Sequence, residues 1–137
     1  MPTICFVCDY NACRSQMGEA LGRVLLPEQF AVCSAGLYPG TVNTLTTEVM
    51  QEIGVDLSSQ TSKTLEAVPM DRMDCVVVLA EPALEPCKAH GAKQIVYWPF
   101  SDPLRAPGDD AAVKDAVRQV RDTLHERILT LPTLMEP

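Results

Sequence analysis

The 137-residue sequence has few basic residues, few aromatic residues and no long apolar run. Lysine and arginine together number 11 against 18 acidic residues, which gives a formal net charge of −7. Nucleic acids and anionic membranes attract proteins through basic patches, so this balance argues against both as partners. No segment approaches the roughly 18 consecutive apolar residues of a membrane span, and no basic stretch precedes the first apolar run. We therefore expect a cytoplasmic protein without a signal peptide or membrane helix.

Histidine is scarce too, and neither His90 nor His125 has a cysteine or histidine partner at metal-ligand spacing. We expect no metal site. Six cysteines would suggest a disulfide framework in a small secreted chain, but 47% hydrophobic residues make such staples unnecessary. In a reducing compartment, cysteines in strands are expected to fill the core and cysteines in loops to carry chemistry. Cys5, Cys33 and Cys75 fall in expected strands.

Short apolar runs alternate with segments of helical periodicity along the chain. The expected strands cover residues 3–7, 30–35, 75–80 and 94–98, and the expected helices cover 14–26, 43–53 and a long stretch from 109 or 110 to 131. The apolar run at 75–80 is typical of a strand that is covered on both faces of a parallel sheet. The alternation predicts an α/β doubly wound fold, with a four-stranded parallel sheet flanked by helices, in one domain of residues 1–137.

Apolar spacing also predicts which helix faces are buried. In the first helix, Met17, Leu21 and Val24 are spaced to share one face. The last helix has apolar residues at gaps of three and four, and its arginines are expected to form the solvated face. The apolar positions are Val113, Val117, Val120, Leu124, Ile128 and Leu131, and the arginines are Arg118, Arg121 and Arg127.

The first expected strand runs into a segment in which a cysteine and an arginine are separated by five residues. A loop that leads from a strand into a helix N-terminus turns successive backbone N–H groups inward, which makes an oxyanion-binding site. We therefore predict that this segment binds a tetrahedral oxyanion. Its residues are Cys8, Asp9, Tyr10, Asn11, Ala12, Cys13, Arg14 and Ser15.

Four side chains of this loop have predicted tasks. Cys8 is the expected nucleophile, because the helix N-terminus, the loop amides and Arg14 favour its thiolate form. Arg14 supplies a planar fork of donors for two oxygens of the oxyanion. Asn11 is expected to brace the loop, and Ser15 to donate a hydrogen bond to the thiolate. The alternative interpretation is a surface cysteine beside a solvated arginine.

A second candidate residue follows the fourth expected strand. Asp102, in Ser101-Asp102-Pro103, should reach the same edge of the sheet as Cys8, where a carboxylic acid can protonate a departing oxygen. An Asp-Pro pair is also an ordinary turn, in which the aspartate bonds its own backbone. The sequence leaves both interpretations open.

Several motifs spread over nearly the full length occur together. They are Cys-x5-Arg-Ser-Gln-Met at 8–17, Ser-Ala-Gly at 34–36, Thr-Ser at 61–62, the Val-rich strand at 75–80, Trp-Pro-Phe-Ser-Asp-Pro at 98–103 and Val-Arg-Asp at 120–122. With these motifs the sequence resembles the low-molecular-weight protein tyrosine phosphatase superfamily, and within it the thioredoxin-coupled arsenate reductases. The resemblance implies a three-layer α/β/α arrangement. Gln16-Met17 and Leu104-Arg105 resemble the reductase branch, since the phosphatases tend to have proline and tyrosines at these places.

The resemblance implies arsenate reduction with no bound cofactor. Cys8 would attack arsenate held by the loop and Arg14, and Asp102 would help hydroxide leave as water. A second thiol would then attack Cys8 sulfur, release arsenite and leave a disulfide. In the related three-cysteine relay that thiol ends the strand at 75–80, where this sequence has Ala80, and the third thiol is present as Cys87. The reductant would be thioredoxin, glutaredoxin or a small thiol.

Two routes remain open for the second thiol. A helical step from position 80 to 87 spans about 10 Å, whereas a disulfide needs Cα atoms about 4.4 to 6.8 Å apart. Either Cys87 attacks after the 81–87 segment moves, or an external thiol attacks. Cys87 as an inert packed cysteine is the third interpretation.

The resemblance also bears on a cation. Some related reductases hold potassium with residues that match Asn11, Glu19, Ser34 and an aspartate, and the last position is Lys63 here. A lysine ammonium beside Glu19 would supply the same charge, which again predicts no metal. Lys63 as a solvated surface residue is the alternative.

Two other functions compete with arsenate reduction. A tyrosine phosphatase would use Cys8, Arg14 and Asp102 but release phosphate by water attack, without a second thiol. A non-enzymatic oxyanion or thiol sensor would pair Cys8 with Cys13 or Cys87 on oxidation.

Overall fold

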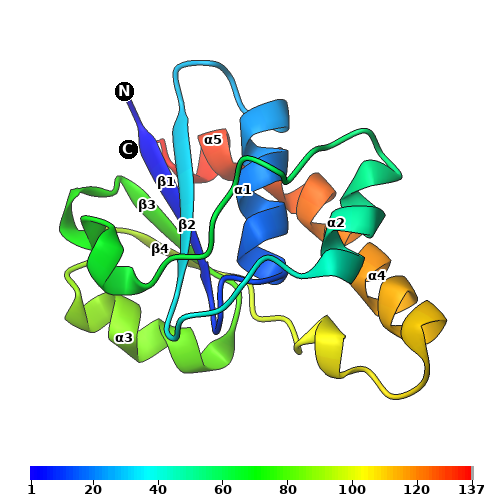
Figure 1. The fold of residues 1–137 in the computed structure, drawn as a ribbon. Coiled ribbons are helices and arrows are strands. Elements are labelled where there is room, and N and C mark those ends of the chain that lie inside the picture. Colours follow the sequence, from blue (N-terminus) through cyan, green and yellow to red (C-terminus); the bar gives the residue numbers. More distant parts are fainter. Residues whose placement is uncertain (137) are drawn as a thin grey trace.

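A computed structural model describes residues 1–136, so residue 137 of the predicted domain lies outside the described residues. Its sheet has four parallel strands in the order β2-β1-β3-β4 (Figure 1). The strands are β1 (Thr3–Cys8), β2 (Ala31–Gly36), β3 (Cys75–Val78) and β4 (Ile95–Tyr97). The predicted α/β fold and its four parallel strands are confirmed, with each strand within three residues of its expected bounds.

Helices cover both faces of this sheet (Figure 1). One face packs against α1 (Arg14–Leu25) and α4 (Asp110–Ile128). Helix α2 (Thr44–Gln51) packs against α4, and α5 (Leu131–Leu134) follows α4 in the chain. The other face packs against α3 (Leu84–Ala89) and neighbouring 3₁₀ turns. The three-layer α/β/α arrangement is therefore present. Within residues 1–136, no helix is long and apolar enough to cross a membrane.

Side chains of β1 alternate between the two faces of the sheet, so the thiols of Cys5 and Cys8 lie on opposite faces. Ile4, Phe6 and Cys8 belong to the core cluster on the α1 side, whereas Cys5 and Val7 belong to the cluster on the α3 side. From β1 the chain continues to β2 at one side of the sheet, and β3 adds on the other side. The carboxyl end of β1 is thus the point where connections diverge, which is where ligands bind in such sheets. Cys8 is the last residue of β1.

The predicted buried face of α1 is partly wrong. Met17 and Leu21 are buried, but Val24 is 64% exposed. Small residues make the contact with the sheet instead: a Cβ added to Gly18 would lie 2.6 Å from the Phe6 ring, and one added to Gly22 would lie 3.2 Å from it. Two glycines let the helix backbone approach β1, and this rotates Val24 to the outside.

The last helix also departs from expectation. It ends at Ile128, so Leu131 belongs to the separate helix α5, although it is buried as predicted. Arg121 is not solvated: it is 8% exposed and donates to Val49 O at 2.9 Å and to Glu52 Oε1 at 2.9 Å. Arg127 lies over the Phe100 ring, 5.2 Å from its centroid.

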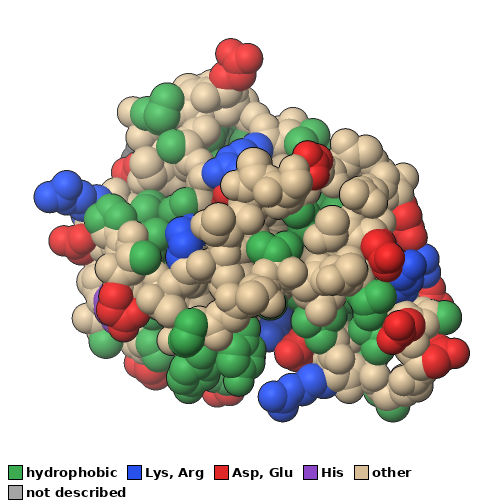
Figure 2. All heavy atoms as spheres, in the orientation of Figure 1, with side chains coloured by type: hydrophobic (Ala, Val, Ile, Leu, Met, Phe, Trp, Pro, Cys, Tyr) green, Lys and Arg blue, Asp and Glu red, His purple; other side chains and the backbone are tan. Residues whose placement is uncertain are grey.

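Exposed ion pairs lie between α2 and α4. Arg118 binds Glu52 at 2.7 Å, and Lys114 binds Glu48 at 3.1 Å. Figure 2 shows this edge of the molecule, where red side chains surround a blue one. Such exposed pairs contribute about 0 to 1 kcal/mol each.

Candidate active site

The backbone between β1 and α1 is turned so that its carbonyl groups bond outward. Six successive carbonyl oxygens accept hydrogen bonds from the surrounding structure: those of Cys8, Asp9, Tyr10, Asn11, Ala12 and Cys13. Within residues 1–136, the backbone N–H groups of residues 10–13 donate to no protein acceptor. The loop therefore keeps its donors for a ligand. A ring of unused N–H groups before a helix N-terminus is an anion site.

Asn11 holds this loop from inside. Its φ of 52° is in the left-handed region, which asparagine tolerates better than most residues. Its Nδ2 donates to Ser15 Oγ at 2.7 Å and to Ser34 Oγ at 2.9 Å, while its Oδ1 accepts from the N–H of Lys63 at 2.8 Å. One buried amide thus joins α1, β2 and the segment at 61–64.

Cys8 lies at the floor of the loop. Its side chain is 2% exposed, and its Sγ is 2.9 Å from Ser15 Oγ. Because Asn11 donates to the same Ser15 oxygen, the Ser15 hydroxyl hydrogen is free to point at the sulfur. Cys8 opens into a small cavity of about 30 Å³ that Tyr10, Ala12, Cys13, Arg14, Asp102 and Leu104 also line.

Arg14 spans the site from the first turn of α1. Its Nη1 donates to Phe100 O at 2.8 Å, and its Nη2 donates to Asp9 Oδ2 at 3.1 Å. Its Nε is buried and has no hydrogen-bond partner within residues 1–136. These two bonds fix the guanidinium in place, and its Nε remains as a donor for a ligand.

Asp102 reaches the same cavity from the loop after β4. Its Oδ1 accepts from Leu104 N at 3.0 Å, so the turn interpretation of the sequence is correct. Its Oδ2 is 3.9 Å from Arg14 Nη2 and 3.9 Å from Arg105 Nε. The turn aims the second oxygen at the cavity of Cys8, so the two interpretations are compatible.

Sequence reasoning missed two residues that shape the loop. Gly36 pairs with Cys8 across the strands, and a Cβ there would lie 2.6 Å from Asn11 N and 2.9 Å from Asp9 O. Gln16 donates to Asn11 O at 2.9 Å and to Thr61 O at 3.1 Å. A glycine at the end of the strand beside the nucleophile was the signal available for the first. Gln16 appeared only within the motif of the resemblance, and no local pattern indicates that its amide bonds Asn11 O and Thr61 O.

The remaining thiols near the site have apolar surroundings. Burial raises the pKa of the Cys13 thiol to about 12, in spite of a hydrogen bond with Thr46. Cys87 is fully buried in the cluster on the α3 side of the sheet, and burial raises its pKa to about 11. Cys8 belongs to the opposite cluster, which also contains Ala80. The structure does not bring Cys87 to the cavity of Cys8.

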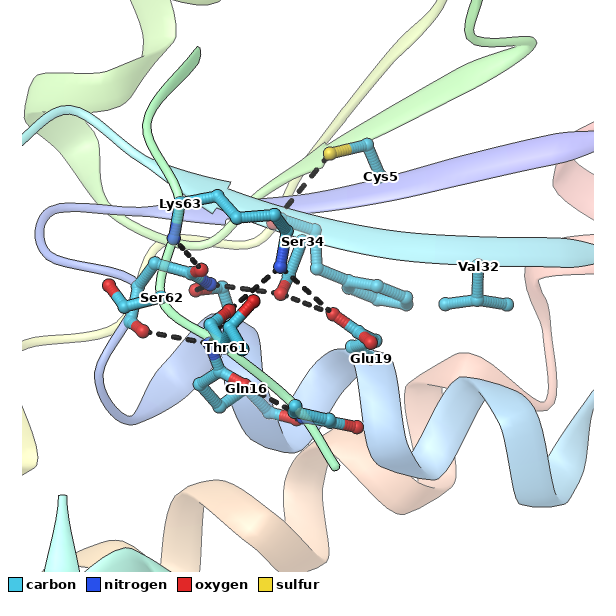
Figure 3. A network of polar contacts seen from close by, with 12 residues as sticks. Cys5, Gln16, Glu19, Val32, Ser34, Thr61, Ser62 and Lys63 are labelled. Atoms are coloured by element: carbon cyan, nitrogen blue, oxygen red, sulfur yellow. Dashed lines mark hydrogen bonds and ion pairs between the residues drawn. The ribbon is translucent and has the colours of Figure 1, made fainter. Parts of the chain in front are cut away.

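Lys63 is not a solvated surface residue. Its Nζ donates to Thr61 O at 2.8 Å and is 3.8 Å from Glu19 Oε1, which also accepts from Ser34 Oγ at 2.5 Å (Figure 3). Figure 3 shows the lysine side chain reaching back so that its ammonium lies among these oxygens. Within residues 1–136, no group of three or more His, Cys, Asp or Glu side chains has the arrangement of a metal site.

A parallel α/β sheet with a cysteine at the floor of an anion loop defines a class of enzymes that use a thiol against tetrahedral oxyanions. Residues 3–131 match the low molecular weight phosphotyrosine protein phosphatase family, and the chain belongs to it. A protein named arsenate reductase from Halalkalibacterium halodurans is 40% identical over 128 residues, which are 93% of this chain and 92% of that protein.

This chain is also similar to solved structures of arsenate reductases. An arsenate reductase in the phosphate binding state is 30% identical with a TM-score of 0.79, and one in the oxidized state is 28% identical with a TM-score of 0.84. Each comparison covers 99% of this chain and 100% of the other.

Proposed function

We propose that this protein is an arsenate reductase in which Cys8 is the nucleophile. The observation that carries the proposal is the convergence of Cys8, Arg14 and Asp102 on one cavity beneath a loop with unused N–H donors. A relative that is 40% identical over nearly the whole chain and named arsenate reductase supports the choice of substrate.

The first step follows from this geometry. Arsenate enters the loop with its oxygens on the backbone N–H groups and Arg14, and the Cys8 thiolate attacks arsenic. The departing hydroxide takes up a proton through the carboxyl group of Asp102 and leaves as water. Arsenic(V) is then linked to Cys8 sulfur.

The second step needs another thiol. That thiol attacks Cys8 sulfur, the sulfur–arsenic bond breaks with its electron pair on arsenic, and arsenite departs. Two thiols have lost two electrons, and arsenic(V) has become arsenic(III). The reaction therefore consumes a thiol reductant at each turnover.

We propose that the second thiol is external. Cys87 lies in the other core cluster with a raised pKa, so its attack would require α3 to leave the sheet. The supplier is thioredoxin, glutaredoxin or a small thiol. Ala80 is in the Cys8 cluster, which gives a gain-of-function test. The Ala80→Cys variant should form a disulfide between positions 8 and 80 after arsenate is added without external thiol. Peptide mapping checks this bond, and its absence would count against the relay geometry.

One assay tests the main proposal. The chain is incubated with arsenate and, in parallel, with an aryl phosphate, each with and without a thiol reductant, and arsenite and free phosphate are measured. We expect arsenite only with thiol, and no arsenite from Cys8→Ser. Cys33→Ser, which removes a half-buried thiol from β2, is the matched control and should keep activity.

A phosphatase is the second candidate, and the mouth of the site gives it some support. The rings of Tyr10 and Tyr38 lie 5.5 Å apart and line a cavity with Asp102, where an aryl group would fit. Rapid release of phosphate without reductant would favour this function. Binding of oxyanions with no turnover under any reductant would favour a sensor.

Lys63 gives a separate test. Its ammonium occupies the place beside Glu19 and Ser34, so we propose that activity is indifferent to potassium. Arsenite formation in sodium and in potassium buffers of equal ionic strength should agree within about twofold, since screening is equal. Strong stimulation by potassium would contradict the substitution.

A further inference from the structure

Asp9 follows the nucleophile directly and pairs with the arginine that an oxyanion needs. Its Oδ2 accepts from Arg14 Nη2 at 3.1 Å. Its Oδ1 is buried and, within residues 1–136, has no hydrogen-bond partner, and the same holds for Arg14 Nε. Both residues line one cavity of about 320 Å³ together with Asp102. Asp9 and Arg14 thus each keep one buried polar atom unmatched, and both residues lie at the entrance to the anion loop.

The charges around this entrance oppose a fully deprotonated ligand. Asp9, Glu81 and Asp102 line the entrance against the guanidinium groups of Arg14 and Arg105. A dianion without a proton would place a bare oxygen against the Asp9 carboxylate, and the two negative charges would repel each other.

A ligand oxygen that carries a proton can donate a hydrogen bond to Asp9 instead of being repelled by it. The backbone N–H groups of residues 10–13 and Arg14 Nε are donors, so they match bare oxygens. Asp9 Oδ1 is an acceptor, so it matches an O–H group. A hydrogen bond to a carboxylate is among the stronger ones, whereas a buried acceptor left unpaired costs free energy.

We propose that Asp9 is a specificity-determining residue that selects tetrahedral oxyanions with a protonated oxygen. Hydrogen arsenate and hydrogen phosphate carry that proton at neutral pH, whereas sulfate and dianionic aryl phosphates do not. The site then favours inorganic arsenate over phosphate esters. This inference rests on the proposed function for its natural ligand. Asp102 is less suited to the task, because Oδ1 is bonded to Leu104 N and Oδ2 faces two guanidinium groups.

Calorimetric titration of the reduced chain with inorganic phosphate and with sulfate, near neutral pH, tests the inference. Wild type should bind phosphate at least about tenfold more tightly than sulfate, as one charged hydrogen bond provides. Asp9→Asn, whose amide can donate, should bind sulfate about tenfold more tightly than wild type. Asp9→Ser is the second variant, and melting temperatures check that both fold.

Glu81→Gln is the matched control, since it removes the same charge at the same entrance. It should change both affinities by the same factor, about twofold or less. Equal binding of sulfate and phosphate by wild type would overturn the inference. So would an equal change of both affinities in Asp9→Asn, or loss of the discrimination in Asp102→Asn instead.

The outcome is separable from that of the reductase assay. If no arsenite forms but phosphate is still distinguished from sulfate, the role of Asp9 stands and the proposed reaction falls. If arsenite forms and sulfate binds as well as phosphate, only the role of Asp9 falls.

Discussion

Cys8 and Cys87 are equally hidden from solvent but have opposite surroundings. Their exposed fractions are 2% and 0%. Cys8 has a hydroxyl 2.9 Å from its sulfur and shares a cavity with a guanidinium and a carboxylate. Cys87 packs in an apolar cluster that raises its pKa to about 11. The two thiols are therefore equally buried, and they differ in the polar groups that surround them.

The fold places the two thiols in these surroundings. Side chains of β1 alternate, and Cys8 ends the strand on the side of α1, where loop donors and Arg14 begin. Cys87 lies on α3, against the opposite face of the sheet. A single sheet thus separates a polar thiol site from an apolar one.

The largest expected effect comes from removing the guanidinium fork beside Cys8. Arg14→Lys removes the fork, because lysine offers a point charge without the bidentate geometry. Arsenite formation should fall about 10²- to 10³-fold in kcat/KM. Arg118→Lys, at an exposed ion pair far from the loop, should change little. Steady-state assays with a thiol reductant measure both, and near-wild-type activity of Arg14→Lys would contradict the role of the guanidinium.

The next effect concerns the amide that holds the loop. Asn11→Ala removes three hydrogen bonds and leaves a less suitable residue at φ 52°, so stability should fall by about 1 to 3 kcal/mol together with activity. Asn11→Gly keeps the backbone angle accessible and isolates the loss of the side chain.

Asp109→Ala is the control for Asn11. It removes the N-cap of α4 and should lower stability by about 1 kcal/mol with kcat/KM unchanged. Urea unfolding and steady-state kinetics compare the three variants. Full activity of a folded Asn11→Ala would show that the loop needs no brace.

The smallest expected effect concerns Cys87, in the apolar cluster on the α3 side of the sheet, and the pH dependence of stability. Burial raises the pKa of Cys87 from an ordinary value of 9.0 to about 11. Between these values the unfolded chain releases a proton that the folded chain keeps, so the free energy of unfolding should fall as pH rises. In Cys87→Ala this alkaline fall should be shallower. Urea unfolding measured between pH 9.0 and about 11 gives the slope of the free energy of unfolding against pH. An unchanged slope in Cys87→Ala would mean that burial does not raise the pKa of the Cys87 thiol.

The sequence was sufficient for the four strands and for the start of the last helix, but not for the break between α4 and α5. Alternating apolar runs predicted four parallel strands, and a cysteine and an arginine with five residues between them predicted the anion site, because both depend on local spacing. Val24 was misplaced because apolar periodicity counts large residues, whereas Gly18 and Gly22 make the close contact with Phe6. No local pattern records how near two backbones can approach.

Long-range partners account for the other differences. Arg121 bonds Val49 O, 72 positions earlier in the chain, and nothing near Arg121 indicates that partner. The pairing of Asp9 with Arg14 is only five positions apart, but it depends on the curl of the loop rather than on helical spacing. Lys63 shows that a resemblance can identify an unusual position, and the structure then supplies its contacts with Thr61 and Glu19.

A single turnover with arsenate and one equivalent of a small thiol, stopped by acid and mapped by mass spectrometry, tests the central claim most directly. We predict a mixed disulfide between Cys8 and the small thiol, formed together with arsenite, while Cys87 stays a free thiol. A bond between Cys8 and Cys87, or arsenite formed with Cys8 unmodified, would contradict the account.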